Sequence, residues 1–106
     1  MPQRIGGAVA EPLVLINVCE VPAEEAEQFI AAWEKMRDYL KSLPGYIDTA
    51  LHQAIAPEAD FQFVNVAHWR SAEEFLAASQ TSEFLDSAVG LVGYPLHPSL
   101  YRVVRT

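Results

Sequence analysis

Residues 61–69 alternate between apolar and other side chains, which predicts a β-strand. Every second residue of a strand faces the same side of the sheet. One side of this strand is therefore aromatic and apolar, except for the carboxamide of Asn65 and the indole N–H of Trp69. Such a wall suits an aromatic small molecule, and a strand core with one hydrogen-bonded Asn explains the same pattern. The residues on that side are Phe61, Phe63, Asn65, Ala67 and Trp69.

The rest of the hydrophobic pattern predicts further elements on both sides of this strand. Residues 13–19 form an apolar run interrupted by Asn17, which is typical of a strand covered on both faces. Pro22 begins a helix that extends to Lys41, with an apolar stripe along one face. The spacing of Ser71 and Glu74 predicts a capping box at the start of a second helix. The remaining predictions are a strand at 46–54, a loop at 56–60, a helical segment at 82–89 and a last strand at 100–104.

The predicted order is strand, helix, strand, strand, helix, strand. This order is that of a ferredoxin-like βαββαβ unit, an α+β fold with a four-stranded antiparallel sheet and helices on one face. Both sides of the sheet look apolar, because Val14, Ile16, Val64 and Val66 face away from Asn17 and Asn65. Two helices cover only one side. We therefore expect a homodimer joined sheet to sheet.

Composition narrows the class of protein further. The 106 residues suffice for one domain, which we place at residues 13–106 behind a flexible arm at 1–12. The net charge of −7 and the scattered basic residues argue against nucleic acid as a partner. No apolar run is long enough to span a membrane, and the first residues are too weak for a signal peptide, so we expect a cytoplasmic protein.

Candidate groups for metal or acid–base chemistry are few. Cys19 is the only cysteine, and it sits in an apolar strand where it is expected to pack as a small hydrophobe. No His accompanies the acidic residues at the start of the first helix, so we expect no metal site. No general base stands out among the histidines, which are His52, His68 and His97. Tyr94 and Tyr101 either cover the pocket or lie at the dimer seam.

Residues 13–105 resemble the antibiotic biosynthesis monooxygenase superfamily, whose members form dimeric α+β barrels. The resemblance rests on the first strand with Asn17, on the segment F-V-N-V-A-H-W-R-S-A-E-E-F, and on the closing P-L-H-P-S-L-Y-R-V-V. The cofactor-free anthrone oxygenases of this superfamily use an Asn on the first strand and an Asn and a Trp, four residues apart, on the third. These positions match Asn17, Asn65 and Trp69, which are therefore the expected catalytic residues.

The resemblance implies a cofactor-independent monooxygenase that oxidises an anthrone-like or quinol-like aromatic with O₂. The N–H groups of the catalytic residues are expected to stabilise an enolate oxygen. The residues expected to line the aromatic pocket are Phe29, Trp33, Phe61, Phe63 and Phe75. A heme-degrading oxygenase is the alternative among enzymes, but such relatives need a His on the second helix to ligate iron, where this chain reads Ala77-Ala78-Ser79-Gln80. A non-catalytic dimer that binds a small apolar ligand is the alternative from another class.

Overall fold

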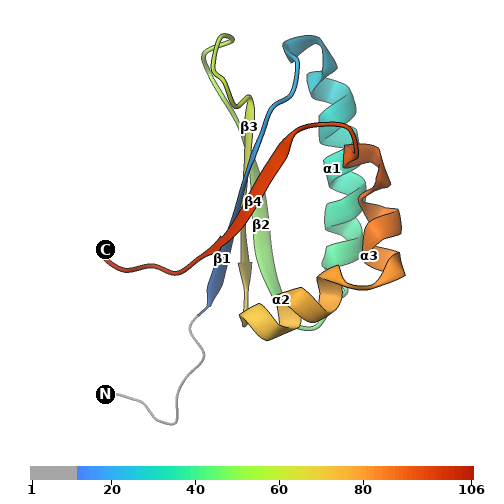
Figure 1. The fold of residues 1–106 in the computed structure, drawn as a ribbon, viewed down its shortest axis with the longest axis vertical. Helices are drawn as coiled ribbons and strands as arrows, with labels where there is room; N and C mark the ends of the chain where they lie inside the picture. The colour runs from blue at the N-terminus through green and yellow to red at the C-terminus, as the bar shows by residue number, and fades with distance from the viewer. Residues whose placement is uncertain (1–11) are drawn as a thin grey trace.

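The computed structural model describes residues 12–106, so the arm expected at residues 1–12 lies outside the described residues except for Pro12. The four strands form one antiparallel sheet in the order β2-β3-β1-β4, and the helices lie together on one of its faces (Figure 1). This arrangement confirms the ferredoxin-like α+β fold. The elements are β1 (Leu13–Cys19), η1 (Ala23–Glu25), α1 (Ala26–Leu40), β2 (Tyr46–Gln53), β3 (Phe63–Trp69), α2 (Ala72–Ser79), α3 (Ser82–Ser87), η2 (Val89–Leu91) and β4 (Leu96–Tyr101).

The core lies between the sheet and α1. The alternation predicted for β3 is present, because every second residue from Phe63 to Trp69 is buried on the side of the helices. The apolar stripe of α1 packs against this side, with Phe29 1% exposed. The buried residues form two clusters, one around Phe29 and Phe63 and the other around Leu40 and Trp69. The two clusters hold the helical layer at a fixed position over β1 and β3.

The last strand, β4, lies earlier in the chain than the predicted residues 100–104. Pro98 is in the middle of the strand and lies opposite Asn17 of β1. Proline lacks a backbone N–H and is tolerated in a strand when that strand is at the edge of the sheet. Among the strands of residues 12–106, β4 pairs only with β1, so Pro98 does not interrupt the sheet. The prediction was wrong because it treated Pro95 and Pro98 as the end of a loop.

Strand β2 contains an irregularity near its start that changes which residues face the helices. The register with β3 shifts between Tyr46 and Asp48, as in a β-bulge. Tyr46 therefore packs edge-on against Trp69, with ring centroids 5.9 Å apart, and Ile47 is 49% exposed. Regular alternation along β2 would place Ile47 on the same side as Thr49. The bulge leaves Thr49 facing the helices and removes Ile47 from that side.

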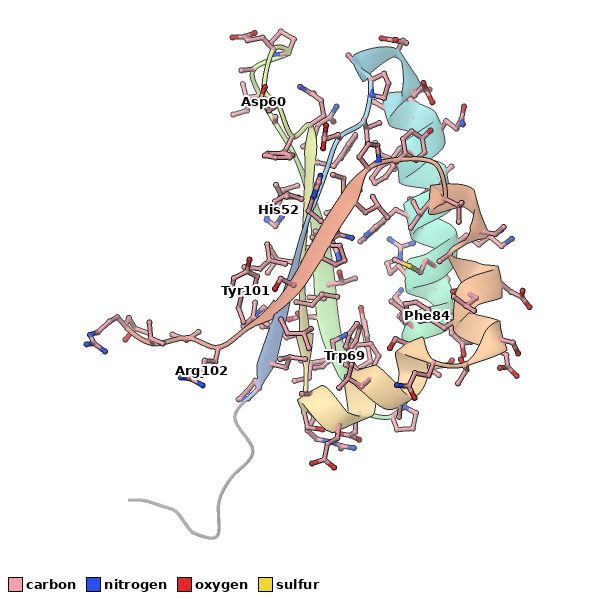
Figure 2. All side chains as sticks on the ribbon, viewed as in Figure 1. His52, Asp60, Trp69, Phe84, Tyr101 and Arg102 are labelled. Atoms are coloured by element: carbon pink, nitrogen blue, oxygen red, sulfur yellow. The ribbon has the colours of Figure 1, made fainter. Side chains whose placement is uncertain are left out.

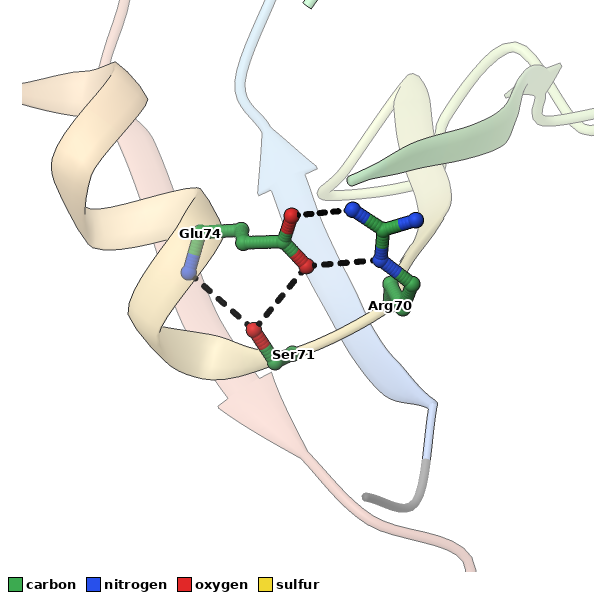
Figure 3. Close-up of polar contacts among 3 residues, drawn as sticks. All are labelled: Arg70, Ser71 and Glu74. Atoms are coloured by element: carbon green, nitrogen blue, oxygen red, sulfur yellow. Dashed lines mark hydrogen bonds and ion pairs between the residues drawn. The ribbon is translucent and has the colours of Figure 1, made fainter. Parts of the chain in front are cut away.

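Helix α2 begins with the predicted capping box. The backbone N–H of Glu74 donates to the Ser71 hydroxyl at 3.2 Å, and that hydroxyl donates to the Glu74 carboxylate at 3.3 Å (Figure 3). Arg70 binds both oxygens of the same carboxylate, which lowers the pKa of Glu74. Gly45 packs closely on this group, because a Cβ built there would lie 2.7 Å from the Glu74 Cβ. The turn before β2 and the start of α2 thus depend on each other.

The face of the sheet opposite the helices carries no helix of the described chain. Its residues include Val14, Ile16, Val64 and Val66, all of which remain partly exposed. His52 and Tyr101 extend from the sheet on the side away from the helices (Figure 2). We call this surface the open sheet face. Among the helices of residues 12–106, none combines the length and the apolar character that crossing a bilayer requires.

Candidate active site

A cavity of about 460 Å³ lies between the sheet and the helical layer. Its wall is mostly apolar and receives residues from β1, β3, α1, α2, α3 and the segment that leads into β4. Figure 2 shows Trp69 on the helix-facing side of the sheet, across from the helical layer that carries Phe84. The volume is within the range of roughly 300–1,000 Å³ that is usual for small-molecule sites. The polar side chains in its wall are Asn17, Asn65, Trp69, Ser79 and Tyr94.

Asn65 is held by its carboxamide oxygen. The indole N–H of Trp33 donates to Asn65 Oδ1 at 3.1 Å, and the hydroxyl of Thr49 donates to the same oxygen at 2.7 Å. Asn65 is only 6% exposed, so these two bonds fix the orientation of its side chain in a buried setting. Within residues 12–106, the side-chain NH₂ group of Asn65 makes no hydrogen bond. With its oxygen occupied, Asn65 acts toward the cavity as a hydrogen-bond donor.

Asn17 is oriented in a similar way by a different partner. It lies directly opposite Asn65 in the pairing of β1 with β3, so both carboxamides belong to the same side of the sheet. The backbone N–H of His97 in β4 donates to Asn17 Oδ1 at 3.0 Å. This bond again leaves the NH₂ group as the part of the side chain available to a ligand. The sheet therefore presents two neighbouring amide donors at the cavity.

Trp69 carries a donor that lacks a partner. Its side chain is 0% exposed and packs edge-on against Tyr46 and Phe75. Among the described residues 12–106, its Nε1 is the one buried side-chain nitrogen or oxygen without a hydrogen-bond partner. Leaving a buried donor unsatisfied costs about 1–3 kcal/mol. An unsatisfied donor on a residue of a cavity wall is expected where a bound ligand supplies the missing hydrogen-bond acceptor.

The five aromatic residues expected to line the pocket are not brought together. Phe75 lines the cavity, as expected. Phe29 and Phe63 stack on each other with ring centroids 4.8 Å apart and belong to the core beside it. Phe61 precedes β3, is 41% exposed and contacts the ring of His97. Trp33 lies behind Asn65, where it orients the amide and does not line the cavity.

The reason for these differences is geometric. The stripe of α1 and the alternation of β3 identify residues that face the core, but they do not tell which core positions remain unfilled. The cavity wall includes residues of α2, α3, η2 and the segment after η2, namely Phe75, Phe84, Leu91 and Tyr94. The sequence missed Thr49, although it faces the helices. Only the register of β2 with β3 shows that its hydroxyl reaches Asn65.

Of the described residues that line the cavity, Tyr94 is the one that is ionisable. The histidines lie elsewhere, since His68 pairs with Asp48, His97 with Glu20, and His52 with a backbone carbonyl. Cys19 is 2% exposed in the core, and its burial raises the pKa of the thiol to about 11. Residues 12–106 contain no cluster of three His, Cys, Asp or Glu side chains that is suited to a metal ion.

The fold and cavity define an α+β protein with a small apolar ligand site in which N–H donors predominate. The chain belongs to the antibiotic biosynthesis monooxygenase family, which it matches over residues 12–88. A proposed monooxygenase from Shewanella loihica PV-4 is 40% identical, with a TM-score of 0.79 over 93% of this chain and 100% of that one.

Two further comparisons extend this result. SnoaB, a cofactor-independent oxygenase from Streptomyces nogalater, has the same fold at 21% identity, with a TM-score of 0.75 over 92% of this chain and 97% of its own. Protein SchA of Streptomyces halstedii is 32% identical over 80 residues, which are 74% of this chain. This chain spans only 20% of the length of SchA.

Proposed function

We propose that this protein is a cofactor-independent monooxygenase that oxidises an electron-rich, anthrone-like or quinol-like aromatic with O₂. The observation that carries the proposal is the buried Nε1–H of Trp69, a residue of the apolar cavity wall, because this donor has no hydrogen-bond partner within residues 12–106. Asn17 and Asn65 add donors whose oxygens are already occupied. The description of SnoaB as a cofactor-independent oxygenase supports the same reading.

The reaction proceeds in steps that need no group outside the substrate, O₂ and the protein. An anthrone CH₂ group loses a proton and gives an enolate, whose oxygen accepts hydrogen bonds from Asn17, Asn65 and Trp69. The enolate passes one electron to O₂, and the resulting radical and superoxide combine to form a peroxide after protonation. The peroxide loses water, so CH₂ and O₂ become C=O and H₂O. Removing one donor of this kind typically lowers the rate by about 10²–10³.

The substrate we propose is uncharged. Among residues 12–106, none of those that line the cavity is a Lys, Arg, Asp or Glu. Transfer of an isolated carboxylate or phosphate into such a wall is strongly unfavourable without a cationic partner. A neutral polycyclic phenol loses little hydration on entry and gains contact with the side chains of Phe75 and Phe84. We therefore expect neutral anthrones to be better substrates than anthrone carboxylates.

We further propose that the protein is a homodimer joined through its open sheet face. The valines and isoleucine on this face are partly exposed and lie at the centre of the sheet on β1 and β3. A second copy of the same face supplies the apolar partner that the helices do not. Sedimentation should give twice the mass of one chain. Val66→Glu should give a monomer, whereas Ile55→Glu, at a fully exposed loop position, should leave the dimer intact.

The proposed activity is tested by O₂ uptake with a panel of neutral anthrones and hydroquinones on metal-free protein. We expect turnover without added flavin, heme or metal, and a drop of at least tenfold in kcat for Trp69→Phe and Asn65→Ala. Phe75→Leu is the matched control, because it changes the apolar wall and keeps every donor, so it should raise KM more than it lowers kcat. No uptake above the uncatalysed rate, with aromatics still bound, identifies instead a ligand-binding protein without this activity.

A further inference from the structure

Among the described residues of the cavity wall, Tyr94 is the one whose side chain donates to a carboxylate. The proposed reaction begins when the substrate loses a proton, so the proton must leave an apolar space. Asn and Trp side chains carry no basic group, the Ser79 hydroxyl donates to the backbone carbonyl of Leu76, and none of His52, His68 and His97 lines the cavity. Of the wall residues within 12–106, Tyr94 alone is ionisable, and its hydroxyl donates to a carboxylate. Tyr94 is therefore the candidate for the residue through which the proton leaves the cavity.

Tyr94 is connected to a carboxylate. Its hydroxyl donates a hydrogen bond to Glu25 Oε1 at 2.9 Å and accepts one from Gln28 Nε2 at 3.2 Å. Its ring is held edge-on against Phe29, with centroids 5.2 Å apart. Tyr94 and Glu25 are partly buried and Gln28 is exposed, so the chain of groups runs from the cavity wall to the surface.

The hydrogen bond to Glu25 raises the pKa of Tyr94, so the phenol keeps its proton at neutral pH. A neutral phenol that already donates to a carboxylate is prepared to pass its proton on when a new one arrives. The lone pairs of its oxygen remain the accepting side, and Gln28 occupies only part of that capacity. The hydrogen bond from Tyr94 to Glu25 thus points in the direction in which a proton would move out of the cavity.

We propose, on the basis of the proposed function, that Tyr94 and Glu25 form the proton exit of the site. The proton leaves the CH₂ carbon of the substrate, whose C–H electron pair stays behind as the enolate. Tyr94 Oη accepts this proton while its own hydroxyl proton moves to Glu25 Oε1. Glu25 then releases a proton to water and returns to the carboxylate. No oxidation occurs in this step, and O₂ enters only afterwards.

A purely structural role makes a different prediction. In that case the Tyr94–Glu25 bond only ties the segment before β4 to the start of α1. Glu25→Gln keeps an oxygen that can accept a hydrogen bond from Tyr94. It therefore retains the link between the two segments while it removes the basic carboxylate. Glu24→Gln is the matched control, since Glu24 is the exposed neighbour in the same helical turn and makes no side-chain hydrogen bond within residues 12–106.

The test is hydrogen–deuterium exchange at the CH₂ group of a neutral anthrone under strict exclusion of O₂. We expect wild type and Glu24→Gln to accelerate the exchange, and Glu25→Gln and Tyr94→Phe to do so at least tenfold less. General acid–base catalysis is worth about 10²–10⁴ in rate. Binding of a non-reactive anthraquinone should change less than threefold in all variants, which shows that the fold and cavity are retained.

The outcomes separate the two proposals. If Glu25→Gln and Tyr94→Phe exchange at the wild-type rate, the proposal of a proton exit is wrong. O₂ uptake by wild type in that case still supports the proposed oxygenase. Exchange that depends on both residues without any O₂ uptake supports the proton exit and contradicts the oxygenase. If wild type accelerates neither exchange nor O₂ uptake, both proposals fail.

Discussion

The hydrogen bond from Thr49 to Asn65 gives a sharp test of how the amide donor is oriented. Thr49→Val removes the hydroxyl that donates to Asn65 Oδ1 at 2.7 Å and keeps the shape of the side chain. Trp33 remains as the other donor, at 3.1 Å. A single hydrogen bond of this kind contributes about 0.5–1.5 kcal/mol. If that energy acts on the orientation of the NH₂ group in the transition state, kcat falls by about three- to tenfold.

The assay is steady-state O₂ uptake with a neutral anthrone, together with thermal unfolding of the same samples. Thr49→Val should lower kcat and leave KM within about twofold, because Asn65 lines the cavity and Thr49 does not. Thr49→Ser is the matched control, since it keeps the hydroxyl and loses only a methyl group. We expect Thr49→Ser to retain most of the wild-type kcat.

Two results refute this reasoning. In the first, Thr49→Val lowers the melting temperature but has the kcat of wild type, which means that the bond stabilises the fold without orienting Asn65. In the second, Thr49→Ser and Thr49→Val lose equal activity, which assigns the effect to packing of the methyl group.

Three further predictions concern stability and reactivity. A residue other than glycine in the left-handed region costs roughly 1–2 kcal/mol. Gly45→Ala should destabilise the protein by more than this, because φ is +88° and the new Cβ meets Glu74. Gly93→Ala, where φ is +108° and the Cβ enters open space, should cost only this backbone strain, as measured by thermal unfolding. Ser71→Ala should cost about 1 kcal/mol, measured by chemical denaturation, because it removes the N-cap of α2. The pKa of Cys19, about 11 in the folded protein, exceeds its value of 9.0 in the unfolded chain. Wild type should therefore lose stability relative to Cys19→Ala as the pH rises from 9 to 11. An unchanged difference in stability between the two proteins over this range would contradict the raised pKa.

Much of the fold could be predicted from periodicity. The alternation in β3 and the stripe on α1 identified the helix-facing side of the sheet, because burial on one face imposes these repeats. The capping box at Ser71 identified the start of α2, because its hydrogen bonds are local. The end of the chain was harder. Whether Pro98 interrupts a strand depends on β4 being at the sheet edge, which is a property of the whole sheet.

The candidate site was predicted in part. Asn17, Asn65 and Trp69 line one cavity, and their catalytic roles stay a prediction. The sequence alone did not separate core aromatics from cavity aromatics, since Phe63 and Trp69 share a face and only the latter lines the cavity. The role of Trp33 was hidden as well, because a helix residue and a strand residue 32 positions apart meet only in the folded chain.

The two indole N–H signals of this protein allow the most direct measurement, because its two tryptophans differ in the structure. Trp33 Nε1–H already donates to Asn65, whereas Trp69 Nε1–H has no partner within residues 12–106. We would record both in ¹H–¹⁵N spectra while adding a non-reactive anthraquinone. We predict a downfield shift of the Trp69 proton and little change for Trp33. A bound quinone that leaves the Trp69 signal unmoved would contradict the assignment of this donor to the substrate oxygen.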